Sequence, residues 1–171
     1  MTLTIAKGIS PTQALQLLAP DAQTPIESVG QAQTWAYGQP ESMTAVHVVI
    51  QATSRHGWTL ILEPNGFRAT DVHRLSRLSA HGTAVVIYNN VNALASFQYA
   101  RNGKVLRYFD PLLGHNYQDD PPLPQEKGIA FGSGTGDYTA DCLALAYRLT
   151  GVRIEEADVD DANYPYAVGV A

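Results

Sequence analysis

Residues 83–110 read TAVVIYNNVNALASFQYARNGKVLRYFD, and this stretch decides the fold class. Its first six residues form an apolar run, which predicts a central strand that is covered on both faces. Asn102-Gly103 is a dipeptide typical of two-residue β-hairpin turns, and it separates residues 94–101 from residues 104–110. The stretch therefore predicts three consecutive strands of an antiparallel sheet.

The alternation of residue types predicts how the two strands of this hairpin are paired. The expected pairs are Tyr99 with Leu106, Phe97 with Tyr108, Gln98 with Arg107, and Ala95 with Asp110. This register places aromatic side chains on one face and the pair of Gln98 and Arg107 on the other, as in a sheet with one buried face.

A second hairpin is predicted between residues 44–53 and 58–63, with Arg55-His56-Gly57 as a three-residue loop. The side chains that then share one face are Val48, Ile50, Ala52, Trp58, Leu60 and Leu62. A shift by one residue would set polar side chains such as Gln51 among these apolar groups, so the pattern favours the first register. Glu63-Pro64-Asn65-Gly66 follows as a turn.

Capping residues predict where the helices begin and end. Ser10-Pro11-Thr12-Gln13 begins a first helix. Thr70 or Asp71 can cap a short helix that contains Val72, Leu75 and Leu78 and that Gly82 ends. The last helix covers residues 138–150, with Asp137 as its cap and Gly151 just past its end. Less regular patterns predict a helix over residues 28–35 and an edge strand over residues 152–154.

Together these elements predict a single α+β domain over residues 1–171. It contains a mostly antiparallel sheet of about five strands with helices packed on one face. The predicted portions are a helical N-terminal portion over residues 1–43, a sheet core over 44–110, the helix over 137–150 and an acidic and aromatic tail over 155–171.

Composition narrows the possible function classes. The chain has 171 residues, of which 45% are hydrophobic and 16% are charged, as expected for a packed core rather than a disordered chain. One cysteine excludes an internal disulfide framework and a multi-cysteine zinc site. A net charge of −5 argues against general binding to nucleic acid or to an anionic membrane. Since no secretion signal and no membrane-spanning run is found, we expect a cytoplasmic protein.

The familiar patterns for catalysis, metals and cofactors are not met. Cys142 lies on an apolar helical stripe, which is typical of an inert core thiol. The five histidines show no close pair, and the alternating carboxylates of the tail lack the glycine and the final glutamate of a calcium loop. The glycine-rich run 132–136 is followed by Asp137 rather than a lysine, which disfavours a phosphate loop. We therefore predict no metal and no cofactor.

Three polar residues at strand ends are candidates for a ligand site. Glu63 and Asp110 each end a strand before a proline, and Asn92 lies in a turn between two strands. A carboxylate near apolar groups can act as an acid or a base. If these strand ends meet, Glu63, Asn92 and Asp110 would line the pocket of a small-ligand sensor or a small enzyme. The alternative is that the same side chains satisfy the backbone of their turns.

The tail offers a different kind of surface. Its predicted partner-binding residues are Glu155, Glu156, Asp158, Asp160, Asp161, Tyr164 and Tyr166. An acidic surface captures basic partners through complementary fields. The leading hypothesis is a non-catalytic protein-interaction module, of immunity or regulatory type, that binds another protein, and a basic partner fits best. A homo-oligomer is an open alternative.

Several blocks of the chain, taken in order, resemble a family of uncharacterised actinobacterial proteins, a domain of unknown function. The blocks are GWTL at 57–60, EPNGF at 63–67, LSRLS at 75–79, NVNA at 90–93, FDP at 109–111 and LALAYRLTGV at 143–152. The chain departs from the family at Asn89, where a large aromatic residue is expected, in the glycine-rich run and in the acidic tail. The resemblance implies a single soluble bacterial domain and supplies no activity, cofactor or catalytic residue.

Overall fold

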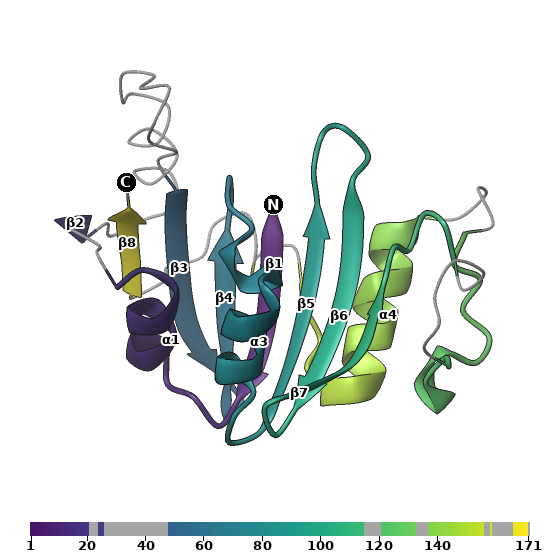
Figure 1. The fold of residues 1–171 in the computed structure, drawn as a ribbon, viewed down its shortest axis with the longest axis horizontal. Coiled ribbons are helices and arrows are strands. Elements are labelled where there is room, and N and C mark those ends of the chain that lie inside the picture. Colours follow the sequence, from purple (N-terminus) through teal and green to yellow (C-terminus); the bar gives the residue numbers. More distant parts are fainter. Residues whose placement is uncertain are drawn as a thin grey trace.

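The computed structural model describes residues 1–20, 24–25, 48–114, 121–132, 137–155, 158 and 166–170. The strands in these residues are β1 (Thr2–Lys7), β2 (Thr24–Pro25), β3 (Val48–Arg55), β4 (Trp58–Glu63), β5 (Thr83–Asn89), β6 (Ala95–Arg101), β7 (Lys104–Phe109) and β8 (Tyr166–Val170). They form one antiparallel sheet in the order β2-β8-β3-β4-β1-β5-β6-β7 (Figure 1). The predicted α+β class and antiparallel sheet are confirmed, and the sheet is larger than predicted.

Helices form at the places that the capping residues predict. The α-helices of the described chain are α1 (Pro11–Leu18), α3 (Val72–Leu78) and α4 (Tyr138–Thr150), and the short 3₁₀-helices are η1 (Arg68–Thr70) and η3 (Pro124–Glu126). The side chains of Ser10, Asp71 and Asp137 accept backbone N–H groups at the three helix starts. α4 ends at Gly151, whose φ of 74° favours glycine. Among the described residues, no helix has the length and the apolar character needed to cross a membrane.

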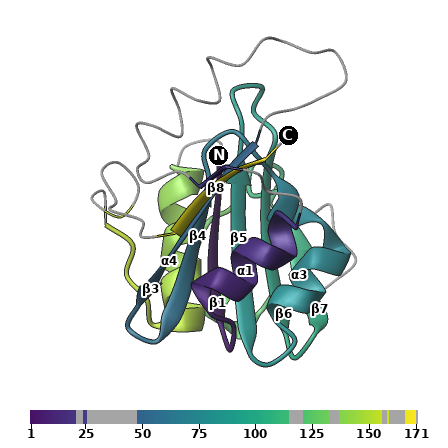
Figure 2. The same ribbon diagram turned by 90° about the vertical axis from the view of Figure 1, so that its left-hand side faces the viewer.

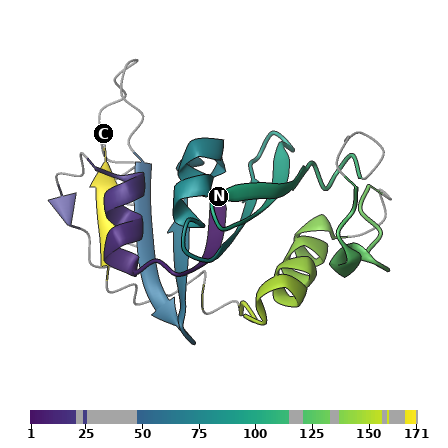
Figure 3. The ribbon, with the colours of Figure 1, turned by 60° about the horizontal axis from the view of Figure 1, so that its bottom comes forward.

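The helices cover both faces of the sheet, whereas the sequence analysis predicted one. Figures 2 and 3 show α1 and α3 on one side of the strands and α4 on the other. The core under α1 and α3 includes Leu15, Leu18, Leu75, Leu78, Ala6, Ala84 and Ala100. The core under α4 includes Leu145, Ala146, Phe97, Phe109 and Phe131. The central strands carry apolar residues on both faces, so each face needs a cover.

Both ends of the described chain lie in the sheet. β1 lies between β4 and β5, although the sequence analysis predicted a helical portion over residues 1–43. β8 pairs with β2 and β3, so the tail returns to the sheet. The predicted edge strand over residues 152–154 does not form, and Val152 is buried in the α4 core instead. The predicted helix over residues 28–35 and the strand start at 44–47 lie outside the described residues.

The turn between β3 and β4 sets a register that differs from the predicted one. His56 and Gly57 form a two-residue turn, with φ of 48° and 77°, instead of the predicted three-residue loop. Gln51 therefore lies opposite Leu62, which is the register that the sequence analysis rejected. The predicted register holds for a sheet with one apolar face. Because both faces are covered, the apolar pattern does not select a register, and the turn decides it.

The hairpin of β6 and β7 has the predicted turn but a different register. Asn102 and Gly103 form the turn with φ of 51° and 77°. The register then shifts by one residue between Tyr99 and Ala100, which is a β-bulge. The observed pairs are Phe97 with Phe109, Gln98 with Tyr108, and Tyr99 with Arg107, so the predicted pairs are wrong. The bulge turns Arg107 inward and leaves Tyr108 51% exposed.

Candidate functional site

The three residues that were predicted to line a pocket lie apart. Glu63 ends β4 and points to the α1/α3 side, where its carboxylate binds the backbone of η1. Asp110 follows β7, and its carboxylate accepts the N–H of Leu112 at 2.8 Å. Asn92 is exposed in the turn between β5 and β6. Since three strands separate β4 from β7, Glu63, Asn92 and Asp110 do not meet.

Glu63 is a fully buried carboxylate that holds the connection between β4 and α3. Its two oxygens accept the N–H of Arg68 at 2.7 Å and the N–H of Ala69 at 2.9 Å. Burial raises the pKa of Glu63 above its usual 4.5, and the two backbone hydrogen bonds and the charges of Arg68 and Arg74 oppose this rise. The geometry therefore matches a side chain that satisfies its turn.

The other reactive side chains of the described chain are dispersed. Cys142 is buried in α4, and burial, aided by the charge of Asp141, raises its pKa to about 12. A thiol with such a pKa is inert at neutral pH. Within the described ranges, no group of three His, Cys, Asp or Glu side chains could hold a metal ion. His47, His115 and residues 133–136 of the glycine-rich run lie outside those ranges.

The predicted partner-binding residues of the tail are described only in part. Asp158 forms an ion pair with Arg55, and Glu155 lies 3.9 Å from the same guanidinium. The N–H of Glu155 also donates to Asp158 Oδ2 at 2.7 Å. Tyr166 begins β8, so its backbone pairs with β3. Glu156, Asp160, Asp161 and Tyr164 lie outside the described residues.

A buried ion pair on the α4 side was missed by the sequence analysis. Arg107 and Glu126 are 0% and 3% exposed, and Arg107 Nε lies 2.8 Å from Glu126 Oε1. Arg107 Nη2 lies 3.1 Å from Glu126 Oε2, which makes the pair bidentate. The guanidinium also lies over the ring of Phe109, 4.6 Å from its centroid. The pair joins η3 to β7 away from solvent, so its role is structural.

Three exposed apolar side chains and one half-buried tyrosine lie on the α1/α3 side, toward the β5–β6 turn. We call this group the aromatic patch, and it consists of Phe67, Val72, Tyr88 and Tyr108. The rings of Phe67 and Tyr88 meet edge to face, with centroids 6.1 Å apart. Tyr108 pairs with Gln98, whose amide donates to the carbonyl of Thr70 near the start of α3. Among the described helices, none lies in front of this end of β5 and β6 (Figure 1).

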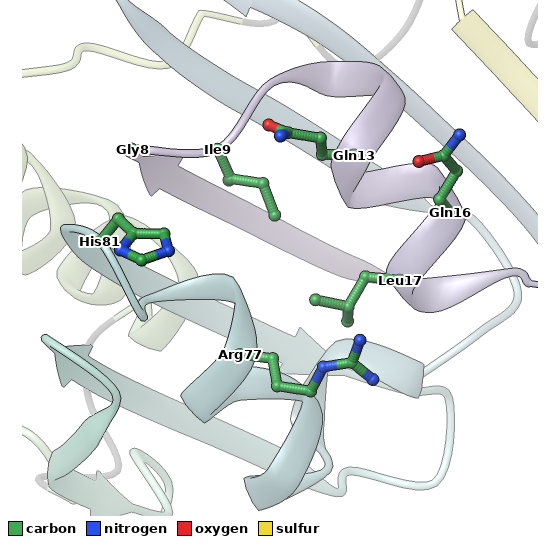
Figure 4. Close-up of a pocket in the computed structure, with 7 residues that line it drawn as sticks. All are labelled: Gly8, Ile9, Gln13, Gln16, Leu17, Arg77 and His81. Carbon is green, nitrogen blue, oxygen red and sulfur yellow. The ribbon is translucent and has the colours of Figure 1, made fainter.

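A recess lies on the same side of the sheet, between α1 and the end of α3. Its volume is about 290 Å³, and it is lined by Gly8, Ile9, Gln13, Gln16, Leu17, Arg77 and His81. Figure 4 shows Ile9 and Leu17 pointing toward the gap from the α1 side, and Arg77 and His81 reaching toward it from the α3 side. We call this recess the α1–α3 groove.

Charge is divided unevenly along the chain. Residues 64–109, which carry α3 and most of the exposed aromatic side chains, contain six Lys and Arg residues and a single carboxylate, Asp71. Residues 110–171, which carry α4, contain eleven carboxylates and three Lys and Arg residues. Arg107 is buried against Glu126 on the α4 side, and the other five cations of residues 64–109 still outnumber Asp71, so this segment attracts acidic groups although the net charge of the chain is −5.

Sequence reasoning missed the aromatic patch for identifiable reasons. Tyr108 was assigned to the buried face because a regular hairpin was assumed. Phe67 was noted only within a block shared with a family. A large aromatic residue directly after the Pro-Asn-Gly turn was the available signal, since residues in turns are usually exposed.

The comparisons with known proteins identify a family. Residues 1–170 match the model of a family of unknown function, DUF6461, so the chain belongs to that family. No curated protein and no solved structure matches the chain. The resemblance drawn from the sequence blocks is confirmed at the level of a family of unknown function.

Proposed function

We propose that this member of the DUF6461 family is a non-catalytic protein-interaction module, of regulatory or immunity type, that binds a partner protein through the aromatic patch. The observation that carries the proposal is the exposure of Phe67, Val72 and Tyr108, which is 62%, 56% and 51%. Burying apolar surface stabilises a complex by about 25 cal/mol per Å². Large apolar side chains exposed on one side of the sheet therefore support an interaction surface there.

Hydrogen bonds hold the backbone on both sides of Phe67, the most exposed residue of the aromatic patch. Glu63 holds the N–H groups of Arg68 and Ala69, directly after Phe67. Thr2 Oγ1 donates to the carbonyl of Gly66 at 2.6 Å, directly before Phe67. An anchor whose backbone is held loses little conformational entropy on binding. Aromatic anchors of this kind supply much of the free energy of protein interfaces.

The surroundings of the aromatic patch favour an acidic partner. Arg74 lies on α3 within one turn of Val72, whereas Arg77, Arg101 and Lys104 lie farther away, at the other end of this helix. The carboxylate of Asp71 already accepts the N–H of Arg74 at 2.9 Å. Complementary charge speeds encounter and selects among partners. The proposed partner is a protein surface with an apolar centre and an acidic rim.

The acidic tail is a weaker candidate for the same role. Glu155 and Asp158 already face Arg55, which reduces the negative charge that they offer to a basic partner. An origin among actinobacterial proteins and a cytoplasmic location are further parts of the proposal, and they are supported by the sequence alone.

Capture of a partner from a lysate of the source organism tests the proposal. The test variant combines Phe67→Ser with Tyr108→Ser, and the matched control is Tyr147→Ser, because Tyr147 is 53% exposed on α4. We expect the test variant to retain at least about tenfold less of the captured protein at two salt concentrations, and the control to retain as much as wild type. Loss in the control with full retention in the test variant would place the binding surface on α4 and refute the proposal.

A further inference from the structure

We propose that the α1–α3 groove is a binding site for a small organic carboxylate with an apolar stem. Its volume of about 290 Å³ is near the lower end of small-ligand sites, which span about 300–1,000 Å³. The groove and the aromatic patch lie at opposite ends of α3, since Val72 begins this helix and Arg77 lies in its last turn. A ligand in the groove therefore leaves the aromatic patch free.

Arg77 and His81 are the two basic side chains that line the groove, at separate places along it. In Figure 4 both side chains reach toward the gap between the two helices. Within the part of the chain that the structure describes, neither side chain forms an ion pair or a hydrogen bond. A guanidinium presents two parallel N–H donors at the spacing that a carboxylate accepts. Arg77 thus offers a bidentate site close to Leu17, and His81 is a separate polar group nearer Gly8.

The walls of the groove are apolar, and its rim carries amides. Ile9 and Leu17 point into the gap and pack against the core under α1 and α3. Gln13 Oε1 accepts the N–H of Ser10 at 2.9 Å, which fixes this side chain and leaves its NH₂ group as a donor. No carboxylate occurs among the described residues that line the groove. The lining therefore suits an anionic head joined to an apolar stem.

The end of the groove at Gly8 is preformed, because two turns pack backbone against backbone there. A Cβ added at Gly8 would lie 2.3 Å from the carbonyl oxygen of His81, and one added at Gly82 would lie 2.2 Å from the carbonyl oxygen of Lys7. Only glycine allows so close an approach of two backbones. The backbone of His81 is thereby held against Gly8. A preformed site loses less free energy to ordering when a ligand binds.

A carboxylate fits the groove better than a phosphate does. Proteins usually hold a phosphate dianion with several cations or with the N–H groups of a helix start. The groove has one guanidinium, and Arg77 lies in the last turn of α3 rather than at its start. The apolar walls formed by Ile9 and Leu17 also favour a ligand with an apolar stem, which inorganic anions lack.

Titration with sodium hexanoate, followed through the backbone amide chemical shifts, tests the proposal. We expect saturable shifts at Gly8, Ile9, Leu17, Arg77 and His81. Hexanol lacks the carboxylate and inorganic phosphate lacks the stem, so each should bind at least about tenfold more weakly. The absence of saturable shifts with hexanoate, or equal binding of hexanol or phosphate, would overturn the proposal.

Two charge variants locate the binding site within the chain. Arg77→Gln removes the charge from an exposed side chain, so it should fold as wild type does, and the amide spectrum reports this. We expect it to weaken hexanoate binding by about tenfold, whereas Arg101→Gln, outside the groove, leaves the binding unchanged. If both variants weakened hexanoate binding equally, the effect would come from the overall charge, and the proposed site at Arg77 would be refuted. Tighter binding of a peptide amide with one glutamate would show that the groove recognises a protein carboxylate instead.

Discussion

The two faces of the sheet are built in different ways. On the α4 face, the rings of Phe97, Phe109 and Phe131 pack in sequence, with centroid distances of 5.4 and 4.8 Å. The buried pair of Arg107 and Glu126 closes the same side. On the α1/α3 face, the aromatic patch and the α1–α3 groove stay open. The packed rings and the buried ion pair indicate that the α4 face supplies stability. A recess of about 340 Å³ also lies beside α4, at Leu143, Tyr147 and Ile154, and we propose that binding nevertheless occurs on the α1/α3 face.

The β-bulge in the β6–β7 hairpin decides which side chains of β7 point to each face of the sheet. In a strand, successive side chains point to opposite faces, so one extra residue exchanges the faces of all residues beyond it. The bulge of β7 places Arg107 and Phe109 on the α4 face and Tyr108 on the α1/α3 face. A regular hairpin would have buried Tyr108 and left Arg107 without access to Glu126.

If the α4 face supplies stability, removing the side chain of Arg107 should lower the free energy of unfolding strongly. Arg107→Ala leaves the carboxylate of Glu126 buried without its cation, so the free energy of unfolding should fall by about 3–5 kcal/mol. Urea unfolding followed by circular dichroism measures this loss. Arg107→Met combined with Glu126→Gln is the control, and it should recover much of the loss because no buried charge is left and the amide oxygen still accepts the N–H of Leu123. A loss below about 1 kcal/mol for Arg107→Ala would mean that the pair does not stabilise the α4 face.

Substitution of Gly8, with Gly57 as a control, tests how tightly the backbone packs at one end of the α1–α3 groove. Both have a positive φ, 87° and 77°, but a Cβ at Gly57 meets nothing within 4 Å, and one at Gly8 meets backbone at 2.3 Å. Gly57→Ala should cost about 1–2 kcal/mol from backbone strain alone. Gly8→Ala should cost about 2–4 kcal/mol, because the collision adds to the strain. Equal losses in thermal unfolding would show that the two turns do not pack tightly.

Glu63 gives the α1/α3 face a pH dependence of known sign. Its pKa is higher in the folded chain than in the unfolded chain, because burial disfavours the charged form. The folded state therefore binds more protons, and its free energy of unfolding decreases as pH rises from the usual 4.5 through the folded pKa. Glu63→Gln lacks this titration. The stability of wild type relative to Glu63→Gln should thus be greatest below pH 4.5 and fall toward neutral pH.

Urea unfolding of wild type and Glu63→Gln over a series of pH values measures this difference. All other titrating groups are common to both proteins, so they cancel to first order. A relative stability that increases with pH would mean that the hydrogen bonds from Arg68 and Ala69 outweigh burial, and that the folded pKa is lowered.

Tyr108 and Phe109 are neighbours in sequence, but their truncation should change the free energy of unfolding by very different amounts. Tyr108→Ser should change the free energy of unfolding by no more than about 0.5 kcal/mol, because half of its surface is already exposed. Phe109→Ala should cost about 3–5 kcal/mol, because its ring is fully buried. Chemical denaturation of both variants measures the contrast. Comparable losses would show that Tyr108 belongs to the core and not to a free surface.

The local elements could be predicted because their signals span few residues. Ser10 with Gln13, Asp71 and Asp137 satisfy N–H groups within three positions of themselves, so the helix starts follow from sequence. The Asn102-Gly103 turn likewise follows from the backbone preferences of two residues.

The registers and the second face could not be predicted, because they depend on distant contacts. The bulge places Arg107 where it reaches Glu126, which lies 19 residues further along the chain. The central position of β1 depends on its pairing with both β4 and β5. Glu63 was singled out from the sequence and is buried, but its role depends on η1 folding back over it.

Amide hydrogen exchange, with and without the captured partner protein, tests most directly whether the α1/α3 face binds. We expect the partner to slow exchange in residues 67–72 and 104–108 and to leave the amides of α4 unchanged. Slower exchange confined to α4, with no change around the aromatic patch, would contradict this account.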